Sequence, residues 1–187
     1  MQALRRIRSA LLLLTGLAIS STGQAADTAD NFEFPASTSI TDQDYQLCST
    51  ADMQVFAFVD LGDVALYLED CEQADFLNQG RLLHFYYRRD FDAEDFRASG
   101  KKLLERNLSE SDFKSLEADI DDFNRVYQST SEGDQYIIGT DKNGLLNLYL
   151  NGEYIGGSDS RAFSKAYFEI WFGKDPFREG VKKDLTP

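Results

Sequence analysis

The residues best suited to binding chemistry lie in one short stretch, RLLHFYYRRDF, at positions 81–91. It holds the only histidine of the chain, and its candidate binding residues are His84, Tyr86, Tyr87, Arg88 and Arg89. Tyrosine hydroxyls and arginine guanidinium groups donate hydrogen bonds, and one arginine can give two of them to a carboxylate. The stretch could therefore hold a carboxylate or an enolate. The alternative is that its tyrosines and histidine pack under helices while its arginines pair with acids such as Asp90 and Asp92.

The same stretch is typical of a β-strand, whose successive side chains point to opposite faces. The two faces carry Phe85, Tyr87 and Arg89 on one side, and His84, Tyr86 and Arg88 on the other. We expect one set to face a layer of helices and a ligand cleft, and the other set to face away. A ligand carboxylate would then bind to the arginine on the cleft side.

Common catalytic motifs are absent from the sequence, which has no GxSxG, Cys-x-x-Cys, HExxH, P-loop or GxGxxG pattern. A single histidine excludes a metal site built from several histidines. The serine spacing offers His84 no partner for a Ser-His-Asp triad. We therefore expect neither a metal nor a cofactor.

Strands before and after this stretch are expected from composition and period. Residues 54–70, QVFAFVDLGDVALYLED, are apolar on both faces and predict a buried strand or a strand pair. Asn143-Gly144 and Asn151-Gly152 are hairpin signals between later strands.

Helices are predicted where the apolar period changes to 3.6 residues. Asp92 and Ser109 are suitable N-caps. The predicted helices span about 92–108, 109–127, 161–172 and 175–184. The order of strands, two helices, strands and helix indicates an α+β fold, with an antiparallel sheet covered on one face by helices.

The first residues indicate export. Arg5, Arg6 and Arg8 precede an apolar run at residues 10–19, and Gly23-Gln24-Ala25 is typical of a cleavage site. We expect residues 1–25 to be a signal peptide and residues 26–33 a flexible lead-in, which makes the protein periplasmic. The alternative, a membrane anchor, is disfavoured because a spanning helix needs about 20 apolar residues. No stable membrane insertion is expected after cleavage.

Charge argues against nucleic acid as a partner. Removing residues 1–25 takes away three arginines and no acid, which leaves 16 basic against 32 acidic residues. Such a chain repels nucleic acids and anionic membrane surfaces. Its oligomeric state is not readable from the sequence.

Two cysteines, Cys48 and Cys71, could form a disulfide in an oxidising compartment. They could face each other if the chain turned at Leu61-Gly62. They would lie tens of ångströms apart if residues 53–69 ran as one extended strand.

Four segments together resemble the chalcone isomerase-like family, and in particular its exported bacterial branch. They are FVDLGDVALYLED, LHFYYRRDFDAEDF, LYLNGEYIGG and AFSKAYFEIWFGKDP, in the family's order and spacing. The resemblance covers residues 34–187 and implies an open-faced β-sandwich, in which an antiparallel sheet and helices enclose a ligand cleft. It also implies that the long first strand runs on through Gly62, which disfavours the disulfide.

The resemblance implies two kinds of activity. The plant enzymes of the family close a chalcone to a flavanone without a cofactor. Relatives that have lost catalysis bind fatty acids in the same cleft, with arginine and tyrosine at the carboxylate.

This sequence departs from the family's catalytic pattern. Gly62 stands where the enzymes have a threonine, Met53 lies near the place of their arginine, and Asp95 or Phe96 falls where a tyrosine is expected. Losing these donors removes the groups that polarise the ketone. Tyr67 matches a family tyrosine and is a further candidate for ligand binding.

Three functional hypotheses follow. We favour a non-catalytic periplasmic protein that binds a small amphipathic or fatty-acid-like ligand in the cleft. The first alternative is a protein-interaction module that uses an acidic helical face. The second is an isomerase, or intramolecular lyase, whose rearranged catalytic groups are Tyr67, Tyr86 or His84.

Overall fold

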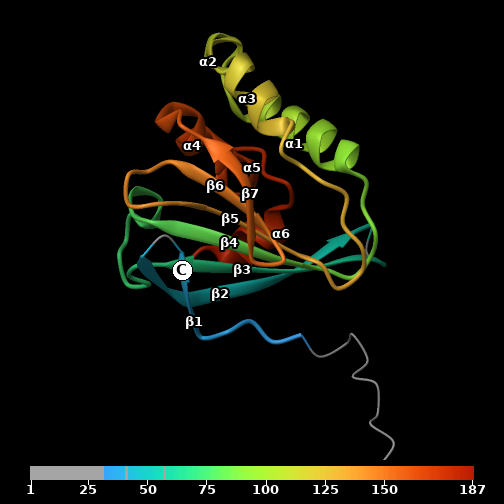
Figure 1. Cartoon of the computed structure of the whole chain (residues 1–187), viewed down its shortest axis with the longest axis vertical. Helices are drawn as coiled ribbons and strands as arrows, with labels where there is room; N and C mark the ends of the chain where they lie inside the picture. Colours follow the sequence, from blue (N-terminus) through green and yellow to red (C-terminus); the bar gives the residue numbers. More distant parts are fainter. Residues whose placement is uncertain (1–31, 41, 57) are drawn as a thin grey trace, which may run out of the picture.

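The computed structural model describes residues 32–40, 42–56 and 58–187. The predicted signal peptide and most of the predicted lead-in therefore lie outside the described residues. Seven strands form one antiparallel sheet, in which each strand pairs with its neighbour in the sequence (Figure 1). The strands are β1 (Ser37–Ile40), β2 (Gln43–Val55), β3 (Val59–Leu68), β4 (Arg81–Tyr87), β5 (Gln135–Thr140), β6 (Leu146–Leu150) and β7 (Glu153–Ser158).

Helices cover one face of this curled sheet, which confirms the predicted fold class. Side chains from five of the helices share one hydrophobic core with β2, β3 and β4. The helices are α1 (Ala93–Asn107), α2 (Glu110–Ser115), α3 (Glu117–Asn124), α4 (Arg161–Tyr167), α5 (Glu169–Phe172) and α6 (Glu179–Leu185), and a short 3₁₀ turn, η2, spans Phe76–Asn78. No helix in the described part of the chain is long and apolar enough to cross a membrane.

Local signals placed several element ends correctly. The Asp92 N–H donates to the Asp95 carboxylate at 3.0 Å at the start of α1, and the Ser109 hydroxyl accepts from the Asp112 N–H at 3.1 Å at the start of α2. Asn151 and Gly152 both take positive φ values, 51° and 83°, as a two-residue hairpin turn requires.

Two predicted helices are each divided in two. The helix predicted from 109 to 127 is interrupted at Leu116, whose N–H bonds to the Asp112 and Phe113 carbonyls at 3.1 and 3.2 Å. The bond to Phe113, three residues back, tightens the turn and ends α2. The helix predicted over 161–172 is interrupted at Phe168, which ends α4 and precedes α5.

Residues 54–70 form the strand pair, which turns between Val55 and Val59, so the alternative of one extended strand over 53–69 is wrong. Val55 pairs with Val59 at the end of this hairpin. The turn brings β2 alongside β3, and Cys48 and Cys71 form a disulfide with their Cα atoms 5.4 Å apart. A continuous strand would have separated these cysteines, and this was the reason for disfavouring the disulfide.

Packing on the second face of the sheet is smaller in extent. Tyr45, Ala65, Tyr67 and Leu82 are buried there, with Phe34 packed against them. Strand β4 is therefore buried on both faces, and all of its residues are inaccessible to bulk solvent.

Candidate functional site

Strand β4 presents its two faces to different surroundings. Phe85 and Tyr87 lie in the main core under the helices and, together with Arg89 just beyond the strand, line an internal cavity. His84 and Tyr86 face the other way and contact the ring of Phe32. The set on the cleft side is therefore Phe85, Tyr87 and Arg89.

The cavity lies between one end of the sheet and the helices α1 and α5, and its volume is about 780 Å³. Its wall is mainly apolar and aromatic, with residues that include Met53, Phe85, Phe96, Leu103, Ile138 and Trp171. Gly100 leaves a gap in the wall on α1, because a Cβ there would meet no atom within 4 Å. Pockets of this size and lining bind small, largely apolar molecules.

Three tyrosine hydroxyl groups supply polar contacts within the apolar wall. The hydroxyls of Tyr127 and Tyr167 are 2.5 Å apart and share one hydrogen bond. Tyr87, the third, makes no side-chain hydrogen bond with any other described residue. Burial raises the pKa of each of the three well above its usual value, so all three stay protonated. Tyr87 can donate to an acceptor on a ligand, and so can whichever of Tyr127 and Tyr167 accepts their shared hydrogen bond.

Arg89 is exposed where the cavity opens to solvent, and it forms no ion pair within the described part of the chain. Two acids lie at the same opening. Asp90 accepts the Glu132 N–H at 2.9 Å, and Asp95 accepts the Asp92 N–H at 3.0 Å, so both carboxylates already have donors. A ligand carboxylate at the opening would therefore find Arg89 as its available cationic partner.

His84, Tyr67 and Tyr86 do not reach the cavity. His84 Nε2 lies 2.8 Å from the Gln135 side-chain oxygen, and burial lowers the pKa of the ring. The Tyr67 hydroxyl donates to the Pro35 carbonyl at 2.7 Å, and burial raises its pKa to about 12. The Tyr86 ring stacks on Phe32 at 4.2 Å. On this face the candidates hold the N-terminal segment against the sheet.

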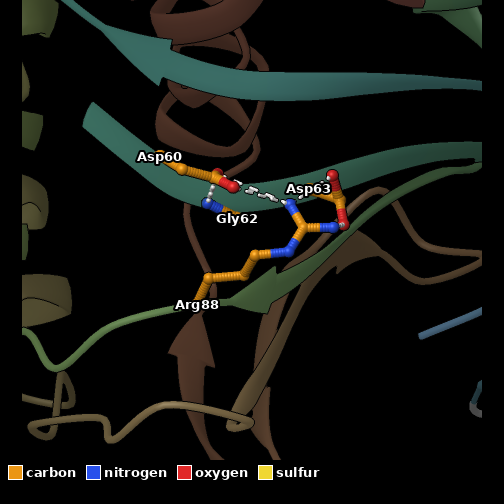
Figure 2. Close-up of polar contacts among 4 residues, drawn as sticks. All are labelled: Asp60, Gly62, Asp63 and Arg88. Carbon is orange, nitrogen blue, oxygen red and sulfur yellow. Dashed lines mark hydrogen bonds and ion pairs between the residues drawn. The ribbon is translucent and has the colours of Figure 1, made fainter. Parts of the chain in front are cut away.

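Arg88 is likewise engaged in a structural contact (Figure 2). Its guanidinium binds Asp63 at 2.5 Å and Asp60 at 3.2 Å, both from β3. Asp60 also accepts the Gly62 N–H at 2.9 Å, so one carboxylate connects the arginine to the backbone of β3. This agrees with the alternative that the arginines pair with acids, although the acids are not the ones named above.

Two positions at which the resemblance implies catalytic donors, Met53 and Gly62, lie side by side in the sheet. Met53 on β2 pairs with Gly62 on β3, and Gly62 pairs with Tyr87 on β4. Met53 and Phe96 line the cavity with apolar side chains. Gly62 takes a φ of 133°, and a Cβ on it would lie 1.9 Å from the Tyr86 carbonyl oxygen. This backbone excludes a threonine at that position.

Charged residues of the helical layer are partly paired with one another. Lys101 on α1 binds Asp121 on α3 at 3.0 Å, and Arg125 pairs with Asp122. The acidic helical face is therefore partly neutralised within the chain. The described residues contain no group of three or more His, Cys, Asp or Glu side chains that could hold a metal ion.

Sequence reasoning missed three cavity residues, which are Tyr127, Tyr167 and Trp171. All three occur on the apolar sides of predicted helices, where they looked like ordinary core residues. A polar atom on an otherwise apolar helix face was the available signal. It did not distinguish a cavity from a filled core.

Comparisons with known proteins agree with this geometry. The sequence profile described as chalcone isomerase-like matches residues 26–186. Among solved structures, a fatty-acid binding protein from Arabidopsis thaliana superposes with a TM-score of 0.65 at 12% identity, covering 83% of this chain and 91% of that one. At this identity the likeness establishes the fold alone. Among curated proteins, no sequence matches the chain significantly.

Proposed function

Because the chain belongs to the chalcone isomerase-like family, we propose that it is a non-catalytic binding protein for a small amphipathic molecule such as a fatty acid. The ligand lies in the cavity between the sheet and helices α1 and α5. One observation carries the proposal: a large, mainly apolar cavity whose wall includes Met53, near the place where the resemblance puts a catalytic arginine. The site has room for a ligand, and Met53 and Gly62 stand at the places where the resemblance puts an arginine and a threonine that polarise the ketone.

The polar groups of the cavity suit an oxygen-bearing ligand. Arg89 at the opening can pair with a carboxylate, and the hydroxyl of Tyr87 can donate to an oxygen acceptor deeper inside. The apolar wall takes up the body of the ligand, and this burial provides most of the binding free energy. That the structurally similar Arabidopsis protein binds fatty acids supports the same choice of ligand class.

Trp171 gives a direct measurement, because it is the single tryptophan of the chain and lines the cavity. We expect palmitate to change the emission of Trp171 and to saturate at one molecule per delipidated chain. Gly100→Leu should weaken binding at least about tenfold, because its side chain extends into the space that the ligand occupies.

Gly180→Leu is the matched control, since Gly180 also has open space around it but does not line the cavity. It should bind palmitate as the wild type does. The wild-type chain should be titrated with saturated fatty acids of about 10 to 18 carbons, a range chosen for a pocket of this size. The absence of any saturable change in Trp171 emission would contradict the proposal.

We further propose that the protein is exported to the periplasm as a member of an exported bacterial branch. The signal-like pattern of residues 1–25 and the Cys48–Cys71 disulfide support this, because disulfides persist in oxidising compartments. Fractionation of cells that express the full chain should recover it in the periplasm, shortened by cleavage near Ala25 or Ala26. Uncleaved protein in the cytosol would argue against export.

A further inference from the structure

The turn between β2 and β3 exposes two large aromatic side chains. Phe56 is 75% exposed and Phe58 is 84% exposed. Within the described part of the chain, one other large hydrophobic side chain is comparably exposed, Tyr154 at 61%. Two phenylalanines at one tip place apolar surface in water without contributing to the core. The tip is therefore a candidate contact surface.

The backbone holds this tip in a defined and unfavourable conformation. Val55 and Val59 form the last residue pair between β2 and β3 before the turn. Phe56 has a φ of 53°, in the left-handed region that bulky side chains disfavour. Backbone strain of this kind is found mainly at active sites, ligand clamps and switch regions. The Arg178 guanidinium lies 5.9 Å from the centre of the Phe56 ring and places a cation beside it.

The tip is also part of the ligand cavity. Phe56 lines the cavity together with Val55 and Leu61, although most of its surface is exposed to solvent. Phe58 does not line it. The cavity therefore opens to the surface at this tip, and a ligand inside it lies close to whatever the tip contacts.

We propose that Phe56 and Phe58 insert into the interface of a lipid bilayer, where the chain takes up or releases its amphipathic ligand. This inference rests on the proposed function. Two side chains form too small a patch for a stable protein partner, since specific interfaces bury about 800 Å² on each side. Binding to the headgroup and acyl boundary of a bilayer, in contrast, scales with the apolar area buried there and uses Phe, Trp and Leu side chains.

The net charge of the chain determines which headgroup charge a bilayer must have for the protein to approach it. With 16 basic against 32 acidic residues after removal of residues 1–25, the exported protein is repelled by anionic surfaces. Arg178, beside Phe56, can approach the phosphate of a zwitterionic headgroup. The expected partner is therefore a bilayer of zwitterionic phospholipids.

Flotation with phosphatidylcholine vesicles tests the docking step. The wild-type protein should float with the vesicles, and Phe58→Ser should reduce its partition coefficient by about tenfold, because one buried phenylalanine is lost. Tyr154→Ser, which removes a comparably exposed aromatic from β7, should partition as the wild type does. Equal partitioning of the Phe58 and Tyr154 variants, or no flotation of the wild type, would overturn the proposal.

A second measurement locates the tip in the membrane. In a Trp171→Phe background, Phe58→Trp and Tyr154→Trp each carry one indole. Brominated phosphatidylcholine should quench the indole at position 58 and leave the one at position 154 unquenched. Absence of quenching at position 58 would contradict insertion, whatever the flotation result.

The same variant separates this inference from the proposed function. Phe58→Ser should bind palmitate in solution with unchanged affinity but transfer it between vesicles about tenfold more slowly. Vesicle docking without palmitate binding would refute the proposed function and leave bilayer contact in place. Palmitate binding with a transfer rate that does not depend on Phe58 would refute the role of the tip in exchange.

Discussion

Gly62 and Tyr87 face each other as partners on β3 and β4, and their backbones approach so closely that Gly62 cannot carry a side chain. A Cβ on Gly62 would lie 1.9 Å from the carbonyl oxygen of Tyr86, the neighbour of Tyr87. Backbone geometry thus closes this position to a threonine side chain, and a substitution of this residue alone cannot reopen it.

Gly62→Thr should therefore destabilise the fold and create no isomerase. We expect a loss of about 3 kcal/mol or more in the free energy of unfolding, because the clash adds to the strain of a β-branched residue at positive φ. Urea denaturation measures it. Gly133→Thr is the matched control, since its φ is 90° with open space around it. The control should lose only about 1–2 kcal/mol, and equal losses would contradict the clash.

Removing the disulfide should lower stability in a predictable way. The bond between Cys48 and Cys71 closes a loop of 23 residues. The double variant Cys48→Ser/Cys71→Ser should lose about 3 kcal/mol of unfolding free energy, since the open loop gives the unfolded chain more freedom. Chemical denaturation of the wild type under reducing conditions should give the same value. A reduced wild type as stable as the oxidised one would show that the bond contributes nothing.

Arg88 and Arg89 are adjacent in sequence but should respond to substitution in opposite ways. Arg89→Ala should weaken palmitate binding about tenfold with unchanged stability, because it removes the cation at the cavity opening. Arg88→Ala should cost about 1–2 kcal/mol of stability and leave affinity unchanged, because it leaves Asp60 and Asp63 without their cation. Tryptophan titration and thermal unfolding separate the two effects, and interchanged phenotypes would contradict the assignment.

Stability should fall in mild acid because of His84. Burial lowers the pKa of the folded-state ring below its usual 6.5. Between these two values the unfolded chain binds more protons, so this contribution is present above about pH 6.5 and lost as pH falls through the folded-state pKa. The slope reaches at most about 1.4 kcal/mol per pH unit. His84→Gln, which stays neutral, should remove this dependence in urea titrations between about pH 5 and 7.5, and a parallel dependence in both proteins would refute it.

Local signals in the sequence were sufficient for much of the fold. The alternation of residues 81–89, the caps Asp92 and Ser109, and the turn at Asn151-Gly152 each depend on neighbours within a few residues. All of them are present in the structure. The resemblance to the family added the overall architecture.

Features that depend on distant contacts were not predictable in this way. Nothing near Phe56 signals a turn, because the residue is a phenylalanine in a left-handed conformation. The choice of cleft face on β4 depends on which side the helices cover. Tyr127 and Tyr167 meet across 40 residues of sequence, so neither segment alone could reveal a polar pair in the cavity wall.

The last helix has a consequence for the order in which the chain folds. Every strand pairs with its neighbour in the sequence, so most of the sheet can form from pairings between consecutive segments of the chain. Helix α6 instead packs on β2, and the Ser49 hydroxyl donates to the Leu185 carbonyl, 136 residues away, at 2.7 Å. This part of the β2 surface therefore stays uncovered until α6 docks, so the hydrophobic core is completed by a contact between the two ends of the domain rather than by strand pairing.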